Sequence, residues 1–160
     1  MRVVEAVPEE LSRGVDRKLV CTILSRELEK GEKRPWVLVI DDDEHIRQLF
    51  ELELTEAGYD VVAIAREDGV FQQMKTIQPN VAILDLQLAD HGGLDLLRQI
   101  REAYPHMPII LCSPYDSYKS SPKAAAADFY VIKSHDLADL RTKVKRAVTA
   151  RSHAQSSSQV

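Results

Sequence analysis

The chain has 160 residues, of which 44% are hydrophobic and 29% charged, and its formal net charge is −4. These values are typical of one folded domain with a real core, and they exclude a disordered or membrane-spanning chain. The N-terminus has no signal-peptide pattern, and Cys21 and Cys112 are too few for a disulfide framework. We therefore expect a cytoplasmic protein without a membrane partner.

Acidic side chains are concentrated in the middle of the chain. Residues 35–133 carry 16 acidic and 8 basic side chains, whereas residues 1–34 and 134–160 are each slightly basic. An acidic block argues against binding of nucleic acid and suits a cation or a basic partner.

Residues 1–34 predict a helical extension. Pro8 and the two glutamates after it suit a helix start, and Lys30-Gly31 suits its end. Seven apolar side chains recur along one wide face: Leu11, Val15, Leu19, Val20, Ile23, Leu24 and Leu28. Burying each fully contributes roughly 1.5–3 kcal/mol, so they are too many to leave in water. We expect this helix to dock on the domain that follows or to pair with its copy in a homodimer. The alternative is an extension that an absent partner orders.

Residues 36–148 alternate between short apolar runs and longer amphipathic segments. Five runs rich in valine and isoleucine predict strands that are buried on both faces: Val37–Ile40, Val61–Ile64, Val81–Leu84, Ile109–Cys112 and Phe129–Ile132. Helical periodicity covers four segments: Ile46–Ala57, Asp68–Ile77, Leu94–Tyr104 and Leu137–Thr149. This alternation predicts a (βα)5 α/β fold, a doubly wound parallel sheet of five strands, over residues 35–150. Residues 151–160, with three consecutive serines, predict a disordered tail.

Polar side chains with useful chemistry stand where four of the predicted strands end. They are three aspartates after the first strand, one aspartate after the third, a serine and a lysine: Asp41, Asp42, Asp43, Asp85, Ser113 and Lys133. In doubly wound sheets, ligands bind outside the carboxyl ends of the strands. Close carboxylates raise one another's pKa unless a cation lies among them, and oxygen ligands open to water suit Mg²⁺. The acidic run is therefore predicted to be the edge of a magnesium site.

Four stretches together resemble a known family. They are Trp36-Val-Leu-Val-Ile-Asp-Asp42, Pro79-Asn-Val-Ala-Ile-Leu-Asp85, Pro108-Ile-Ile-Leu-Cys-Ser113 and Ala127-Asp-Phe-Tyr-Val-Ile-Lys133. In order and spacing they resemble the receiver domain of bacterial two-component response regulators, which has a flavodoxin-like fold. The resemblance places the family's acid pair on Asp41 and Asp42, and its phosphoacceptor on Asp85. It places the switch hydroxyl on Ser113, the switch aromatic on Tyr130 and the family's lysine on Lys133.

The resemblance implies a phosphorylation switch and not an enzyme that acts on a separate substrate. Asp85 would take a phosphoryl group from the phosphohistidine of a histidine kinase or phosphotransfer protein. Mg²⁺ would be held by Asp42, Asp85 and the backbone carbonyl of Gln87, with Asp41 in the outer shell or acting through a water. No DNA-binding domain is predicted after residue 150, so we expect a stand-alone receiver whose changed surface acts on an unidentified downstream protein.

The chain also departs from the family's pattern. Pro114 follows Ser113 and has no N–H to donate to a phosphate, and Ser134 stands where the family has proline. Residues 115–127 are about two residues short and contain Pro122, so the helix expected there should be short, late-starting or mobile. These departures leave an alternative open: a pseudo-receiver that binds other proteins constitutively and is never phosphorylated.

Overall fold

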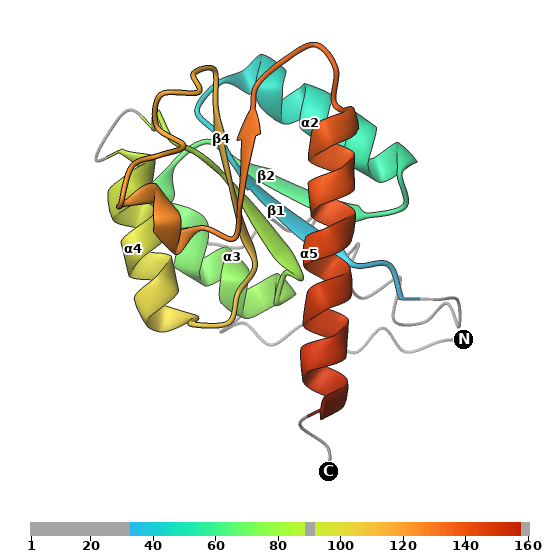
Figure 1. The fold of residues 1–160 in the computed structure, drawn as a ribbon. Helices are drawn as coiled ribbons and strands as arrows, with labels where there is room; N and C mark the ends of the chain where they lie inside the picture. Colours follow the sequence, from blue (N-terminus) through green and yellow to red (C-terminus); the bar gives the residue numbers. More distant parts are fainter. Residues whose placement is uncertain (1–32, 89–91, 158–160) are drawn as a thin grey trace.

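The computed structural model of the chain describes residues 33–88 and 92–157. The predicted helix of residues 8–30 lies outside these residues. The described chain forms strands and α-helices in alternation: β1 (Trp36–Ile40), α2 (Glu44–Glu56), β2 (Asp60–Ile64), α3 (Val70–Ile77), β3 (Val81–Asp85), α4 (Gly93–Ala103), β4 (Ile109–Ser113), β5 (Phe129–Ile132) and α5 (Ala138–Ser157) (Figure 1). Two short 3₁₀ turns, η2 (Glu67–Gly69) and η3 (Ala124–Ala126), complete the list. Within the described ranges, no helix is both long and apolar enough to cross a membrane.

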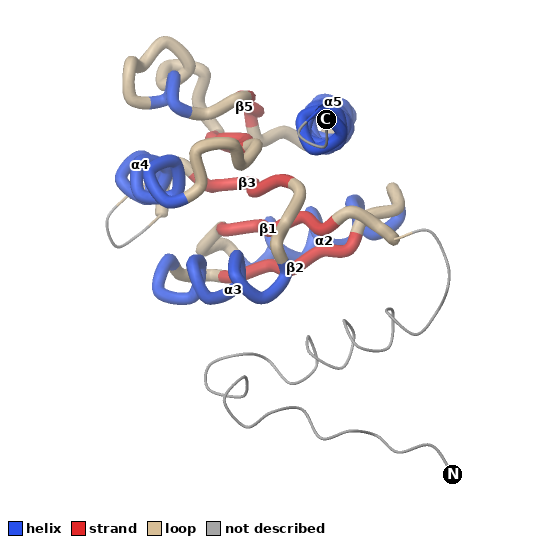
Figure 2. Tube along the Cα trace, turned by 90° about the horizontal axis from the view of Figure 1, so that it is seen from below, coloured by secondary structure: helices blue, strands red, loops and turns tan. Residues whose placement is uncertain are grey.

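All five strands are parallel and form one sheet in the order β2-β1-β3-β4-β5. After β1 the chain adds β2 on one side of that strand, and it then crosses back to place β3, β4 and β5 on the other side. Helices α3 and α4 consequently cover one face of the sheet, and α2 and α5 cover the other (Figures 1 and 2). This is the doubly wound parallel sheet that the sequence predicted, and its order reverses between β1 and β3, where such sheets bind ligands.

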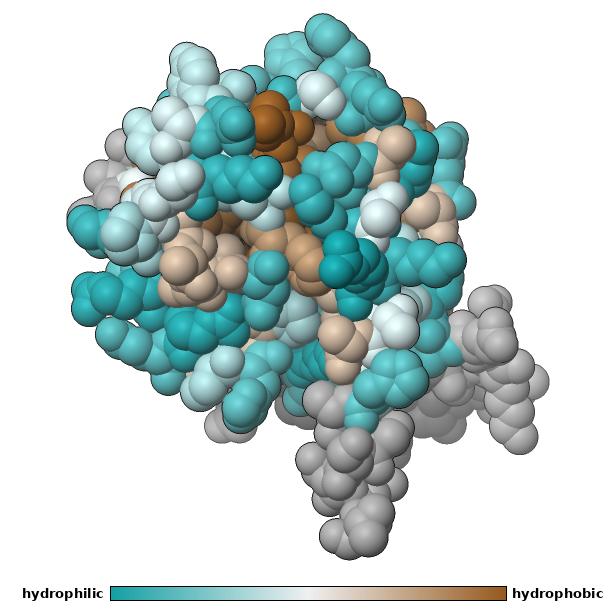
Figure 3. All heavy atoms as spheres, viewed as in Figure 1, coloured by the Kyte–Doolittle hydropathy of each residue, from teal (hydrophilic) through white to brown (hydrophobic). Residues whose placement is uncertain are grey.

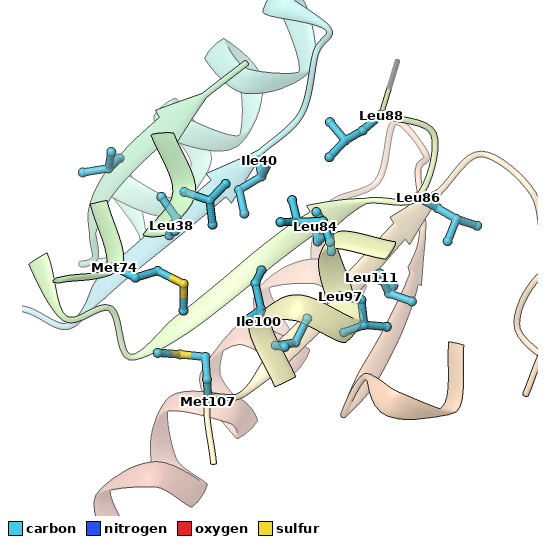
Figure 4. Close-up of a cluster of buried hydrophobic side chains, with 14 of the residues drawn as sticks. Leu38, Ile40, Met74, Leu84, Leu86, Leu88, Leu97, Ile100, Met107 and Leu111 are labelled. Atoms are coloured by element: carbon cyan, nitrogen blue, oxygen red, sulfur yellow. The ribbon is translucent and has the colours of Figure 1, made fainter. Parts of the chain in front are cut away.

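Strand β1, which lies between β2 and β3, shows why both faces need a layer of helices. Its side chains alternate: Val37 and Val39 pack toward α2 and α5, whereas Leu38 and Ile40 pack toward α3 and α4. All four are fully buried. Figure 4 shows the α3–α4 side of the core, where side chains of both helices lie over the strands. Burial on both faces explains the continuous apolar runs in the sequence.

The segment between β4 and β5 agrees with the expectation of a short, late-starting helix. It consists of turns and the single 3₁₀ turn η3 near its end, so the described chain has four α-helices around the five strands. Pro122 supplies no N–H for a helical hydrogen bond, and the serines around it favour turns over helix. Within residues 114–127 only Ala124 is buried.

The C-terminal helix is longer than the sequence predicted. The disordered tail expected from residue 151 is wrong for residues 151–157, because α5 continues to Ser157. The Arg151 guanidinium donates a hydrogen bond to the backbone oxygen of Pro79 and lies 3.4 Å from the sulfur of Met107. These contacts hold the added turn of α5 against the start of β3, and alanine and arginine have high helix propensity.

The start of α4 is pressed against the end of β3. The Gly93 N–H donates to the backbone oxygen of Leu86 at 3.1 Å. A Cβ atom on Gly93 would lie only 2.1 Å from the backbone oxygen of Asp85. Glycine is therefore required at this position for α4 to begin beside the residue that ends β3.

We expect Gly93→Ala to lower the free energy of unfolding by about 1–3 kcal/mol, as overpacking against rigid backbone usually does. Urea-induced unfolding measures this change. Gly69→Ala is the matched control, because a Cβ there would meet nothing within 4 Å. The control should change stability by less than about 0.5 kcal/mol. If both variants unfold at the same urea concentration, the close approach of α4 to β3 is wrong.

Candidate functional site

The acidic run after β1 divides into residues with different environments. Asp41 is buried, whereas Asp42 and Asp43 are exposed. The Asp43 carboxylate accepts hydrogen bonds from the N–H groups of His45 at 2.8 Å and Ile46 at 3.4 Å. These bonds lower the pKa of Asp43, and they make it the N-cap of α2. The third aspartate of the run is thus explained by helix capping.

Asp41 is tied to the protein through both carboxylate oxygens. Its Oδ1 accepts the Asp43 N–H at 3.0 Å, and its Oδ2 lies 2.6 Å from the Nζ atom of Lys133. Burial raises the pKa of Asp41, while the bonds from Lys133 and from the Asp43 N–H act in the opposite direction. Asp42, one residue further on, is the acid of the pair that faces solvent.

Lys133 joins the two buried carboxylates of the site. Its Nζ atom lies 3.2 Å from Asp85 Oδ1 in addition to its contact with Asp41, and its side chain is only 15% exposed. Burial by itself lowers the pKa of Lys133, but the hydrogen bond to Asp41 and the charges of Asp41 and Asp85 outweigh burial and raise the pKa. The lysine is therefore held in its charged form between the ends of β1 and β3.

Asp85 ends β3, and its carboxylate is also bound by the following loop. The Gln87 N–H donates to Asp85 Oδ1 at 3.0 Å. One carboxylate oxygen from each of Asp41, Asp42 and Asp85 can be chosen so that all three lie within 4.8 Å of one another. Oxygen donors of this kind, with one acid open to water, fit Mg²⁺ better than they fit zinc.

Arg47 belongs to this site and was missed in the sequence analysis. Its Nη1 atom donates to the backbone oxygens of Asp41 at 2.9 Å and Asp42 at 3.0 Å. The guanidinium thus fixes the two peptide groups that carry the acid pair. A basic residue one turn into the helix after an acidic run is the signal that could have identified it.

Ser113 and Tyr130 are linked through the backbone of one residue, Tyr115. The fully buried Ser113 hydroxyl accepts the Tyr115 N–H at 3.1 Å, and the Tyr130 hydroxyl donates to the Tyr115 backbone oxygen at 2.7 Å. The Lys133 N–H donates to the backbone oxygen of Ser113 at 2.8 Å. Because Pro114 has no N–H, the first backbone donor after Ser113 is that of Tyr115.

The structure therefore brings together Asp41, Asp42, Asp85 and Lys133 at the carboxyl ends of β1, β3 and β5. Ser113 lies at the end of β4, between the strands that carry Asp85 and Lys133. Gln87 contributes an N–H to Asp85. In the part of the chain that the structure describes, every peptide bond is trans, including the bond between Lys133 and Ser134.

Comparison with known proteins shows that this chain is similar to members of one family. The family model described as response regulator receiver domain matches residues 37–145. Two relatives are DNA-binding transcriptional regulators NtrC: the one from Proteus hauseri is 30% identical over 115 residues, covering 71% of this chain and 24% of the relative. The one from Bradyrhizobium is 30% identical over 114 residues, covering 70% and 24%. The chain thus spans about a quarter of the length of these relatives.

Solved structures show the same similarity. The response regulator TrrA from Thermotoga maritima, in complex with Mg²⁺-BeF, is 32% identical with a TM-score of 0.68, over 71% of this chain and 98% of TrrA. A second structure has TrrA in complex with the histidine kinase ThkA, at 32% identity and a TM-score of 0.66, over 71% and 97% of the two chains. A CheY-like receiver from Methanospirillum hungatei is 27% identical with a TM-score of 0.70, over 76% and 99%. With a family model that covers most of the described domain and with this shared fold, the chain belongs to the response regulator receiver domain family.

Proposed function

We propose that this protein is a phosphoacceptor switch, in which Asp85 takes a phosphoryl group from the phosphohistidine of a histidine kinase or phosphotransfer protein. The observation that supports this proposal most is the position of Lys133, 3.2 Å from Asp85 and 2.6 Å from Asp41 in a largely buried site. Burying charged groups costs stability compared with an apolar core, so a purely structural role explains this cluster poorly. The kinase complex of TrrA supports a kinase as the partner.

The contacts of Asp85 suggest which of its oxygens reacts. Lys133 and the Gln87 N–H both bind Oδ1, so we assign Oδ2 as the nucleophile. Oδ2 forms a bond to phosphorus while the bond from phosphorus to the histidine nitrogen breaks, and the histidine leaves with that electron pair. Lys133 then pairs with a phosphoryl oxygen, where its compact charge offsets the added negative charge.

Asp42, Asp85 and the backbone carbonyl of Gln87 are the Mg²⁺ ligands that we propose. Asp41 takes the outer shell, because its Oδ2 is held by Lys133 at 2.6 Å. When bound, Mg²⁺ supplies positive charge that offsets the charge of the phosphoryl oxygens. The complex of TrrA with Mg²⁺-BeF supports this assignment.

Ser113 and Tyr130 form the output side of the proposed switch. A phosphoryl group on Asp85 attracts the Ser113 hydroxyl, which releases the Tyr115 N–H that it now accepts at 3.1 Å. The Tyr115 backbone oxygen also holds Tyr130, so movement of this peptide reaches the surface at β5. Through that surface the protein contacts a downstream protein, and we place the whole exchange in the cytoplasm.

A pseudo-receiver that binds proteins constitutively is the second candidate. Pro114 favours it, because a missing N–H removes a charge-assisted hydrogen bond worth roughly 1.5–3 kcal/mol. The Tyr115 N–H, which is the next donor along the chain, is occupied by Ser113. The acidic cluster and Lys133 have no evident use in this second function.

Phosphorylation of Asp85 decides between the two candidates. Incubation with Mg²⁺ and acetyl phosphate should add the mass of one phosphoryl group to the intact chain. The Asp85→Asn variant should not gain this mass, since an amide oxygen is a poor nucleophile. Asp95→Asn, an exposed acid on α4, is the matched control and should still react. Failure of the wild-type protein with several small donors would support the pseudo-receiver.

Mg²⁺ should raise the melting temperature. A ligand at 100 times its dissociation constant stabilises by roughly 2.7 kcal/mol, which corresponds to roughly 5–10 °C for a chain of this size. Asp42→Asn should lose most of this shift, whereas the exposed Glu44→Gln, outside the carboxylate cluster, should keep it. EDTA should reverse the effect. An equal shift in both variants would remove Asp42 from the set of ligands.

A further inference from the structure

Helix α2 exposes two leucines to water. Leu49 is 40% exposed and Leu52 is 61% exposed, one turn apart, while Phe50 and Leu54 of the same helix reach the core. We name Leu49 and Leu52 the α2 patch. The other large apolar side chains that are exposed in the described ranges all lie on the β4–β5 side: Tyr115, Tyr118 and Ile132. On the face shown in Figure 3, hydrophilic residues cover most of the surface. The most hydrophobic residues on this face lie near the end of β5.

The chain enters the domain beside the C-terminal end of α2. The Arg34 guanidinium donates to the backbone oxygens of Gly58 at 2.9 Å and Thr55 at 2.6 Å, and it lies 3.7 Å from the Asp60 carboxylate. A cation at this position is favoured by the dipole of α2. Thr55 follows Leu52 by one helical turn, so the described chain begins close to the α2 patch.

The segment of residues 17–30 matches α2 in length, apolar side chains and charge. As a helix it would be about 20 Å long, as is α2 with its 13 residues. It carries four basic and two acidic side chains, whereas α2 carries four glutamates and one arginine. Its apolar side chains lie at helical spacing: Leu19, Val20, Ile23, Leu24 and Leu28.

We propose that residues 17–30 form a helix that packs on the α2 patch of the same chain. The two helices run parallel, because both end beside Arg34. This register sets Ile23 beside Leu49 and the stretch from Leu24 to Leu28 around Leu52. It also sets Lys18 near Glu44 and Lys30 near Glu56, at opposite ends of α2. Gly31 and the two residues after it form the turn into β1.

Cys21 makes this arrangement testable in the full-length chain. Cys112 is fully buried, and burial raises the pKa of its thiol, so it does not react readily. In the proposed register Cys21 lies near Gln48, which is exposed on α2. Gln99 is equally exposed on α4, on the opposite face of the sheet (Figure 2), and is the matched control position.

Oxidation of the Gln48→Cys variant with diamide should join the introduced thiol to Cys21 within one chain. The rate should exceed that of Gln99→Cys by about tenfold or more, because docking raises the effective concentration of the two thiols. Non-reducing electrophoresis and peptide mass spectrometry identify the product. Equal rates in the two variants would overturn the docking. A main product of linked dimers, with a rate that rises with protein concentration, would assign the α2 patch to a second copy and overturn the intramolecular proposal.

A second substitution tests the patch itself. Leu52→Glu, added to the Gln48→Cys variant, should reduce the rate of the intramolecular disulfide to that of the Gln99→Cys control. Ile132→Glu, at another exposed apolar residue, should leave the fast rate unchanged. Both substituted side chains are exposed, and circular dichroism checks that the fold is kept. An unchanged rate with Leu52→Glu would show that the segment does not pack on the α2 patch.

Discussion

One ammonium group between two buried carboxylates organises this protein. Lys133 follows β5, yet its Nζ atom reaches past the end of β4 to Asp85 on β3 and to Asp41 after β1. The raised pKa of Asp41 means that its ionised form costs stability, and this cost grows as pH rises above 3.8. The raised pKa of Lys133 has the opposite meaning, because here the charged form stabilises the folded protein. This stabilisation is fully present below pH 10.5 and is lost as pH rises through the folded pKa of Lys133. At neutral pH each charge is tolerated because the other is present.

The β4–β5 segment shows how a few residues alter a shared fold. Pro114 removes one backbone donor beside Ser113, and Pro122 removes another within the same segment. The backbone of Tyr115 then lies between Ser113 and Tyr130: its oxygen accepts the Tyr130 hydroxyl and its N–H donates to the Ser113 hydroxyl. Without a covering helix, Ile132 and Tyr115 remain exposed next to this peptide.

Helix α2 contributes to several parts of the molecule at once. Its N-cap Asp43 ends the acidic run, and Arg47 in its first turns holds the backbone of the acid pair. Phe50 and Leu54 anchor it in the core, and Arg34 binds its last carbonyls. Helix α2 thus joins the acidic cluster at one end to Arg34, near the start of the described chain, at the other.

The sequence alone determined the sheet, because five apolar runs separated by helical periodicity leave few topologies, and it placed the reactive residues at strand ends. Local signals were sufficient there: burial on both faces and the residue that ends each run. Tertiary structure alone decided which acids meet Lys133 and which acid faces water. It also extended α5 through the contact of Arg151 with Pro79. These outcomes depend on side chains that are far apart in sequence, and the energies of such contacts are not contained in any local pattern.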